Sequence, residues 1–207
     1  MRGIFITGTD TGVGKTLASC TLLHALRARG LRAVGMKPLA SGSDATPDGL
    51  RNEDALALQA ASDPRPRYED VNPYALPLPL APELAAQSDM VVVEGVGGWA
   101  APLSPSLDQA DLVRALGDDV PVVLVVGLRL GCLNHAYLSA RAIAADGCRL
   151  AGWIGTGVDP GMARIDDNRA LLAARLQAPC LGWLPWQPSP DPAALAPLLA
   201  TGTGLIC

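Results

Sequence analysis

Residues 3–29 constrain the fold of this chain more than any other feature of the sequence. A short apolar, β-prone run leads into the glycine-rich turn TGTDTGVGKT, residues 7–16, and leucines at helical spacing begin directly after it. Glycines allow several backbone N–H groups to turn toward one point, and the start of a helix adds its positive end to such an anion site. The segment therefore predicts a strand, a phosphate-binding loop and a helix in succession.

The loop supplies the groups that a nucleoside triphosphate needs. Lys15 can reach the terminal phosphates, and the Thr16 hydroxyl can ligate a magnesium ion. The usual motif has four residues between its first glycine and Gly-Lys-Thr, whereas residues 9–13 separate Gly8 from Gly14 here. A plain glycine turn is the alternative, but the flanking strand and helix favour a nucleotide site.

Composition limits the remaining classes of function. At 207 residues the chain suits a single domain, residues 1–207, with a substantial core. The formal charge of −4 argues against a broad basic surface for nucleic acid, and no apolar run approaches the ~20 residues of a membrane span. The five cysteines include no C-x-x-C pair, and the phosphate loop follows the N-terminus too closely for a signal peptide. We therefore expect a cytoplasmic protein with reduced thiols and neither a nucleic-acid nor a membrane partner.

Strand and helix patterns alternate along the chain. Apolar, β-prone runs predict strands at residues 3–7, 33–37, 90–94, 121–127, 150–156 and 180–184, with a weaker strand at 72–76. Helical patterns predict helices at residues 16–29, 53–61, 109–116, 134–145 and 167–177. Residues 38–51 and 63–82 are rich in turn-forming residues and are predicted to be irregular. The alternation predicts an α/β fold with a doubly wound, mostly parallel sheet of the P-loop NTPase type, with ligands at the carboxyl ends of the strands.

The second predicted strand ends in a lysine. Lys37 is followed by Pro38, which prevents a helix from starting there. The Lys37 ammonium is therefore expected beside the phosphates, where it can offset charge on a transferring phosphoryl group or an anionic intermediate. For Lys37 alone, an exposed lysine at a strand end is an equally good interpretation.

Three oxygen-bearing side chains form a candidate magnesium site. Glu94 ends the buried run MVVV, and a carboxylate at the carboxyl end of such a strand in a phosphate-loop protein is expected near the metal. Asp54 lies in the first turn of a predicted helix that Asn52 can cap, and taken alone it is better explained by stabilisation of that helix terminus. Together with Thr16, the two carboxylates predict the oxygen-only shell that Mg²⁺ prefers.

A second glycine-led helix start, Gly131-Cys132-Leu133-Asn134, follows the strand at residues 121–127. Free N–H groups at such a start can hold a carboxylate, although an ordinary helix start is the simpler interpretation. His24 and His135 lie on predicted helices without a nucleophile or a metal-ligand spacing around them. We expect both histidines to be structural.

Taken together, these segments resemble the dethiobiotin synthetase family of biotin synthesis. The matching segments are TGTDTGVGKT (7–16), KPLASG (37–42), GLRNEDALA (49–57), VNPY (71–74), VEGVGGW (93–99), LGCLNHA (130–136) and LGWLPW (181–186), in family order along nearly the whole chain. The resemblance implies an ATP- and Mg²⁺-dependent enzyme that closes a cyclic urea on 7,8-diaminononanoate with CO2. The family reaction passes through an N-carbamate and a carbamic-phosphoric anhydride and releases ADP and phosphate.

The resemblance also implies roles for individual residues. It assigns catalysis to Lys37, Lys15 and Thr11, and metal binding to Thr16, Asp54 and Glu94. It assigns nucleotide binding to Gly12, Val13, Gly14, Lys15, Thr16, Glu94, Gly97, Thr156 and Pro185. It assigns substrate binding to Thr11, Lys37, Ser41, Gly131, Cys132, Leu133 and Asn134, the last four receiving the substrate carboxylate across the subunit boundary of a homodimer.

Three features depart from the family pattern. Gly12 stands where some relatives carry an acidic residue. The stretch between Asn72 and Glu94 is shorter than the resemblance leads us to expect, and residues 80–86 resemble the remnant of a substrate-contacting helix start. Thr156 stands where an asparagine usually reads the adenine edge, so we predict relaxed or shifted base selectivity.

Two other phosphate-loop classes are alternatives. A switch ATPase that positions cargo or binds membrane usually carries a lysine where Asp10 stands, and often a basic amphipathic tail, which residues 200–207 do not provide. A glutamine-dependent amide ligase needs an ammonia-generating domain, for which 207 residues leave no room. The complete set of motifs favours the synthetase.

Overall fold

The computed structural model describes residues 2–40, 42–73, 88–117, 119–202 and 205. Its main sheet has six strands in the order β2-β5-β1-β6-β7-β8, and every neighbouring pair in it is parallel. The strands are β1 (Arg2–Gly8), β2 (Ala33–Met36), β5 (Met90–Gly98), β6 (Val122–Leu128), β7 (Leu150–Gly157) and β8 (Cys180–Leu184). Each overlaps a strand predicted from the sequence, which confirms the parallel α/β fold.

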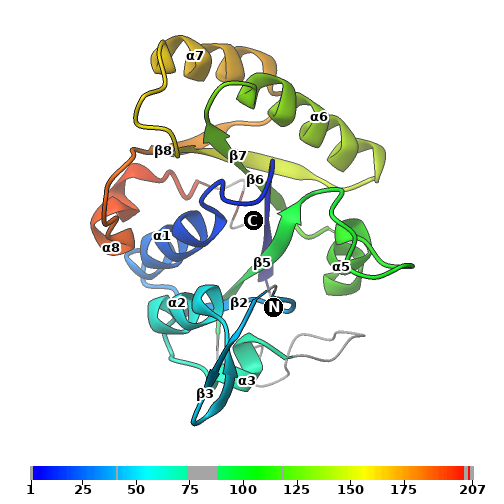
Figure 1. Ribbon diagram of the computed structural model, residues 1–207, viewed down its shortest axis with the longest axis vertical. Helices are drawn as coiled ribbons and strands as arrows, with labels where there is room; N and C mark the ends of the chain where they lie inside the picture. Colours follow the sequence, from blue (N-terminus) through cyan, green and yellow to red (C-terminus); the bar gives the residue numbers. More distant parts are fainter. Residues whose placement is uncertain (1, 41, 74–87, 118, 203–204, 206–207) are drawn as a thin grey trace.

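Helices cover both faces of the sheet, as Figure 1 shows. One face carries α1 (Lys15–Arg27), α2 (Glu53–Ala61) and α8 (Pro192–Leu195), which continues into the 3₁₀ helix η1 (Ala196–Leu198). The other face carries α5 (Gln109–Leu116), α6 (Cys132–Ala145) and α7 (Ile165–Arg175). Two of the predicted helices, α2 and α5, have the predicted bounds, and the other three begin one or two residues earlier than predicted.

The alternation of side chains along the strands decides which face each site residue occupies. In β5, Val92 packs with the α1 face and Val93 with the opposite face. Because strand side chains alternate, Glu94 emerges on the α1 face. In β2, Ala33 packs on the α1 face and Met36 on the opposite one, so Lys37 also emerges on the α1 face. Lys37 and Glu94 therefore lie on the same face, at the carboxyl ends of two neighbouring strands.

The segments predicted to be irregular contain regular structure. A hairpin of β3 (Asp44–Thr46) and β4 (Gly49–Arg51) occupies part of residues 38–51, and the Thr46 hydroxyl donates to the Gly49 carbonyl at 2.7 Å. The short helix α3 (Tyr68–Val71) lies within residues 63–82. The predicted strand at 72–76 is wrong for Asn72 and Pro73, since Asn72 ends α3; residues 74–76 lie outside the described residues.

The C-terminal part of the chain also forms structure that the sequence reasoning missed. Asp191 caps α8 by accepting the Ala193 N–H at 2.9 Å, and Pro192 occupies the first helical position. Leu195 and Leu199 pack into the core beside α1. Among the described residues, no helix combines the length and apolar composition that crossing a membrane requires.

Candidate active site

The phosphate loop joins β1 to α1 at the carboxyl end of the sheet. Gly12 and Gly14 have φ values of 71° and 82°, which disfavour residues with a Cβ atom, and α1 begins at Lys15 directly after Gly14. The first N–H groups of a helix have no partner within the helix, so this start offers donors to an anion. The loop geometry therefore matches the predicted phosphate site.

Lys15 lies folded over the loop. Its side chain is mostly buried, and its Nζ donates to the Asp10 carbonyl at 3.0 Å. Burial lowers the pKa of Lys15 below its ordinary value, while the charge of Glu94 opposes the shift. A phosphate oxygen could take the place of the Asp10 carbonyl as the acceptor.

Lys37, Asp54, Glu94 and Thr16 form one polar cluster beside the loop. The Lys37 Nζ lies 2.5 Å from Glu94 Oε1 and 3.0 Å from Asp54 Oδ2, so a single cation contacts both carboxylates. The Thr16 hydroxyl lies 2.7 Å from Asp54 Oδ1 and 3.1 Å from Glu94 Oε1. Lys37 directly follows β2, and the other three residues come from α2, β5 and α1, so the structure brings together the set predicted from separate segments.

The burial of the cluster makes its charges interdependent. Lys37 is 3% exposed and Glu94 is 0% exposed. Burial alone would lower the pKa of Lys37, but Glu94 and Asp54 outweigh burial and hold it above its ordinary value. Burial would raise the pKa of Asp54, but Lys37 and the Thr16 hydroxyl bring it below its ordinary value. The lysine is therefore charged at neutral pH, and an exposed strand-end lysine is the wrong interpretation.

The oxygen atoms of this cluster fit a magnesium ion. Glu94 Oε2 is buried and accepts no hydrogen bond from any described residue, which leaves an acceptor for a cation. No group of three His, Cys, Asp or Glu side chains suited to a metal occurs in the described part of the chain. Two carboxylates and a hydroxyl suit Mg²⁺, because this ion takes few protein ligands and completes its shell with phosphate oxygens and water.

Two asparagines that sequence reasoning left out of the site hold the cluster in place. The Asn52 side chain accepts the Ala55 N–H at 3.1 Å and so caps the helix turn that carries Asp54. The Asn72 Nδ2 donates to the Lys37 carbonyl at 2.7 Å, and the Lys37 N–H donates to the Val71 carbonyl at 2.8 Å. From the sequence, Asn52 was recognised as a helix cap and Asn72 only as part of the family segment VNPY, because the Asn72 contact with Lys37 spans 35 residues.

Comparison with known proteins shows what kind of enzyme carries this site. A family model described as an AAA domain matches residues 2–194. The ATP-dependent dethiobiotin synthetase BioD of Xanthomonas euvesicatoria pv. vesicatoria (strain 85-10) is 62% identical over 213 aligned residues, covering 93% of this chain and 94% of the relative. The protein of the same name from Xylella fastidiosa (strain 9a5c) is 58% identical over 218 residues, covering 95% and 96%. The chain belongs to the dethiobiotin synthetase family.

Membership of this family makes the chain an ATP-dependent enzyme and decides against the switch-ATPase alternative. Two solved structures show a more distant likeness. The signal recognition particle receptor FtsY from Elizabethkingia anophelis superposes with a TM-score of 0.61 at 18% identity, over 99% of this chain and 64% of that one. The MinC:MinD cell division protein complex of Aquifex aeolicus gives 0.52 at 14% identity, over 91% and 82%. At such identities the likeness shows the phosphate-loop fold alone.

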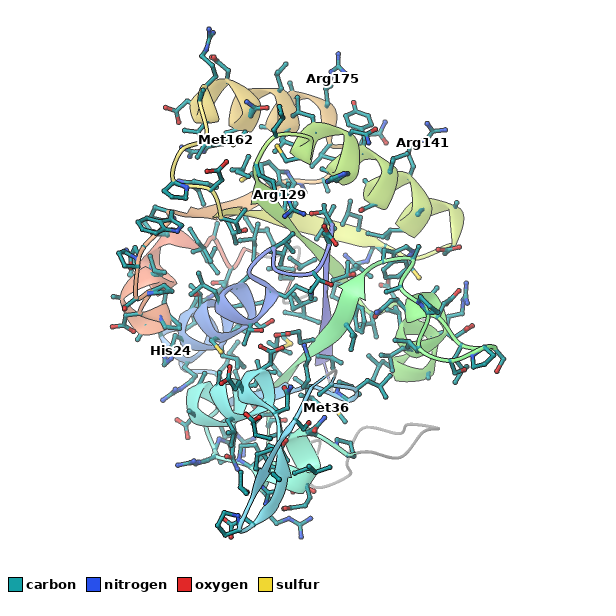
Figure 2. The ribbon with its side chains drawn as sticks, in the orientation of Figure 1. His24, Met36, Arg129, Arg141, Met162 and Arg175 are labelled. Atoms are coloured by element: carbon teal, nitrogen blue, oxygen red, sulfur yellow. The ribbon has the colours of Figure 1, made fainter. Side chains whose placement is uncertain are left out.

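Asp10, which stands in the phosphate loop, forms an ion pair. Its Oδ2 lies 2.5 Å from Arg129 Nη2, and its Oδ1 accepts the Thr11 N–H at 2.7 Å. Figure 2 shows Arg129 near the carboxyl ends of the central strands. The Thr11 side chain is exposed, and a Cβ atom at Gly97 would lie 3.7 Å from its Oγ1, so these two predicted site residues are neighbours.

The remaining predicted nucleotide contacts lie at the ends of the last two strands. Thr156 is near the end of β7, but its hydroxyl donates to the Val13 carbonyl at 2.6 Å and is turned toward the loop. Pro185 directly follows β8. A Cβ atom at Gly157 would lie 2.4 Å from the Trp186 nitrogen, so the chain after β7 and the chain after β8 run side by side. The carboxyl ends of β7 and β8 therefore lie close enough together to contact the same nucleotide.

The predicted substrate residues are divided between two places. Lys37 and Thr11 lie at the loop, whereas Ser41 and residues 80–86 are outside the described residues. The start of α6 has Gly131 at φ 94°, Cys132 buried and Asn134 exposed. An open groove between α6 and α7 is lined by Leu133, Asn134, Tyr137, Leu138, Arg141, Leu171 and Arg175. The start of α6 therefore lies at the surface of the chain.

None of the described cysteines belongs to the cluster of Lys37, Asp54, Glu94 and Thr16. Cys20, Cys132, Cys148 and Cys180 are free, and Cys207 is outside the described residues. Burial raises the pKa of Cys20 to about 12, with Glu94 and Asp54 adding to the shift, so this thiol stays protonated beside the cluster.

Proposed function

We propose that this enzyme converts 7,8-diaminononanoate, CO2 and ATP into dethiobiotin, ADP and phosphate. One amine of the substrate adds CO2 to form a carbamate, and a carbamate oxygen attacks the γ-phosphorus of ATP, which expels ADP. The second amine then attacks the carbamoyl carbon of the mixed anhydride and expels phosphate, which closes the cyclic urea. The observation that carries the proposal is the buried Lys37, held by two carboxylates beside a phosphate loop in a family of this name.

The chain's own residues supply position and charge. Lys15 and the N–H groups of the loop hold the triphosphate, and Lys37 neutralises the carbamate and the transferring phosphoryl group. Thr16, Asp54 and Glu94 would hold Mg²⁺, which when bound neutralises phosphate charge. A strong general base is unnecessary because the carbamate is already anionic. Lys37 turns from the carboxylates to the substrate oxygens as the reactants bind.

We further propose that two copies of the chain form a homodimer through α6 and α7. Three leucines on this side are strongly exposed, Leu130 at 96%, Leu138 at 57% and Leu171 at 44%, and the last two line the groove described above. In Figure 2, Arg141 and Arg175 extend from the same outer surface. A partner covering this face would bring its own nucleotide site close to residues 131–134, which would receive the substrate carboxylate.

We also propose that the enzyme acts in the cytoplasm, where its free thiols would remain reduced.

Base selectivity is proposed to be relaxed, because the Thr156 hydroxyl donates its hydrogen bond to the phosphate loop. Equal concentrations of ATP, GTP and CTP test this point, and exclusive use of ATP would reject it.

The reaction itself is tested by incubating the purified protein with 7,8-diaminononanoate, bicarbonate, ATP and Mg²⁺. We expect dethiobiotin, identified by mass spectrometry, and phosphate in equal amounts. ATP hydrolysis at the same rate with and without the diamine would contradict the proposal.

Sedimentation analysis of the parent and of Leu138→Asp tests the homodimer, which the substitution should dissociate.

A further inference from the structure

Thr156 contacts the phosphate loop and is almost completely buried. Its Oγ1 lies 2.6 Å from the Val13 carbonyl oxygen and 3.3 Å from the Val126 carbonyl oxygen, and the residue is 1% exposed. A threonine hydroxyl has one proton, so the shorter contact with Val13 is the hydrogen bond. The bond joins the end of β7 to a residue 143 positions earlier in the chain.

Val13 is fixed by packing as well as by this hydrogen bond. Its side chain is 1% exposed and fills space left by two glycines on neighbouring strands. A Cβ atom at Gly8 of β1 would lie 2.7 Å from Val13 Cγ2, and one at Gly127 of β6 would lie 3.0 Å from Val13 Cγ1. Three strands, β1, β6 and β7, therefore determine the position of Val13.

The direction of the Val13 carbonyl determines where the next N–H group points. In a trans peptide the C=O and N–H bonds are coplanar and point in opposite directions. Because the Val13 carbonyl points toward Thr156, the Gly14 N–H points away from it. Gly14, at φ 82°, is the N-cap residue of α1, and its carbonyl accepts the Ala18 N–H at 3.0 Å. The direction of the Val13 carbonyl therefore also sets the direction of the N–H donors at the start of α1.

We propose that Thr156 is a positioning residue that fixes the phosphate loop in its nucleotide-binding conformation through the Val13 carbonyl. The inference rests on the phosphate-binding role proposed above for the loop. It differs from the base contact predicted from the sequence, because a residue that acts on the loop affects the phosphates of every nucleotide equally. Thr156 thus contributes to nucleotide affinity without reading the base.

Two pairs of variants test this role. The first pair is the parent and Thr156→Val, which removes the hydroxyl and keeps the shape of the side chain. The second pair is Thr156→Ser, which keeps the hydroxyl, and Thr156→Ala, which differs from it only by the loss of that hydroxyl. We expect the Kd for ADP in the presence of Mg²⁺, measured by calorimetry, to rise about 10-fold on loss of the hydroxyl in each pair. The same fold-change is expected for inorganic tripolyphosphate, which has no base. Thr156→Ser should stay within about 3-fold of the parent.

A matched control is Thr21→Val in α1, where a buried hydroxyl donates to the Leu17 carbonyl at 2.7 Å away from the loop. It should leave both affinities unchanged. If Thr156→Val does not fold, the comparison of Thr156→Ser with Thr156→Ala gives the same information. Unchanged affinity in the variants without the hydroxyl overturns the inference, as does a loss of affinity for ADP but not for tripolyphosphate. If the parent itself does not bind ADP, both the inference and the proposed function fail.

Discussion

At the scale of single residues, the enzyme keeps a buried cation between two acids. Lys37 contacts Glu94 and Asp54 at 2.5 and 3.0 Å, and the mutual attraction offsets the cost of burying the charges. The two carboxylates keep Lys37 protonated, and Lys37 lies where the proposed reaction develops negative charge. The same contacts mean that Lys37 contributes to stability as well as to chemistry, and a test must separate the two.

Replacement of Lys37 by alanine is expected to lower kcat by about 100-fold or more, because the cation beside the transferring phosphoryl group is lost. The free energy of unfolding should also fall, by about 3–5 kcal/mol without Mg²⁺, since Glu94 stays buried without its partner. Steady-state kinetics and urea unfolding measure these two quantities. Arg32→Ala removes an exposed cation at the opposite end of β2 and serves as the control. Normal turnover in Lys37→Ala would remove the residue from its role.

Glu94→Gln tests the magnesium site, because it removes a charge while keeping the size of the side chain. We expect the Mg²⁺ concentration that gives half-maximal activity to rise about 10-fold or more, since a carboxylate ligand becomes a neutral amide. Activity is measured across a Mg²⁺ titration, with Glu69→Gln as the control, because the Glu69 side chain in α3 is exposed. A lower Tm with an unchanged Mg²⁺ requirement would make Glu94 a structural residue.

At the scale of elements, short segments far apart in the chain set the site geometry. The helix α3 has four residues, yet the chain at its end holds the backbone of Lys37 through Val71 and Asn72. Asn72 is 1% exposed, so removing its amide leaves the Lys37 carbonyl without that donor in a buried place.

Asn72→Ala is therefore expected to reduce kcat by about 10-fold through displacement of Lys37, with little change in the KM for ATP. Asn168→Ala provides the control, because Asn168 also donates from its amide to a backbone carbonyl, that of Arg164, on exposed α7. Steady-state kinetics and Tm are measured for both. A lower Tm in Asn72→Ala together with unchanged kcat would contradict a positioning role.

The sequence predicts long elements better than short ones. The strands and most helices follow from apolar periodicity, because burial on one or both faces repeats along the chain. The β3–β4 hairpin has exposed three-residue strands and was missed, although Pro47-Asp48-Gly49 is a recognisable turn signal. The site follows the same rule. Thr16, Lys37 and Glu94 were predicted from their places at element ends, whereas the contact of Thr156 with Val13 joins distant segments and leaves no local pattern.

At the scale of the whole molecule, pH affects stability through His24 on α1, labelled in Figure 2. Burial and the neighbouring Arg27 lower the pKa of His24 below 6.5, while Asp191 opposes the shift. The unfolded state then binds the proton more readily than the folded state. The stability contributed by neutral His24 is therefore present above about pH 6.5 and is lost as the pH falls through the lowered folded-state pKa.

His24→Gln is expected to remove this part of the acid sensitivity. Urea unfolding between pH 7.5 and pH 4.5 should show a shallower loss of free energy in the variant than in the parent below about pH 6.5. Other groups continue to titrate, so the difference between the two curves is the measured quantity. Parallel curves would show that His24 contributes nothing to the pH dependence.

The strand order has a consequence for the synthesis of the chain. β1 is made first, but its neighbours in the sheet are β5 and β6, so it acquires both partners only after residue 128 has left the ribosome. Until residue 98 has been made the apolar N-terminal strand has neither neighbour, and until β6 has been made Val13 lacks the glycine against which it packs. The phosphate loop therefore reaches its final packing only after β6 has been made, and we expect nucleotide to stabilise the nascent chain only from that point onward.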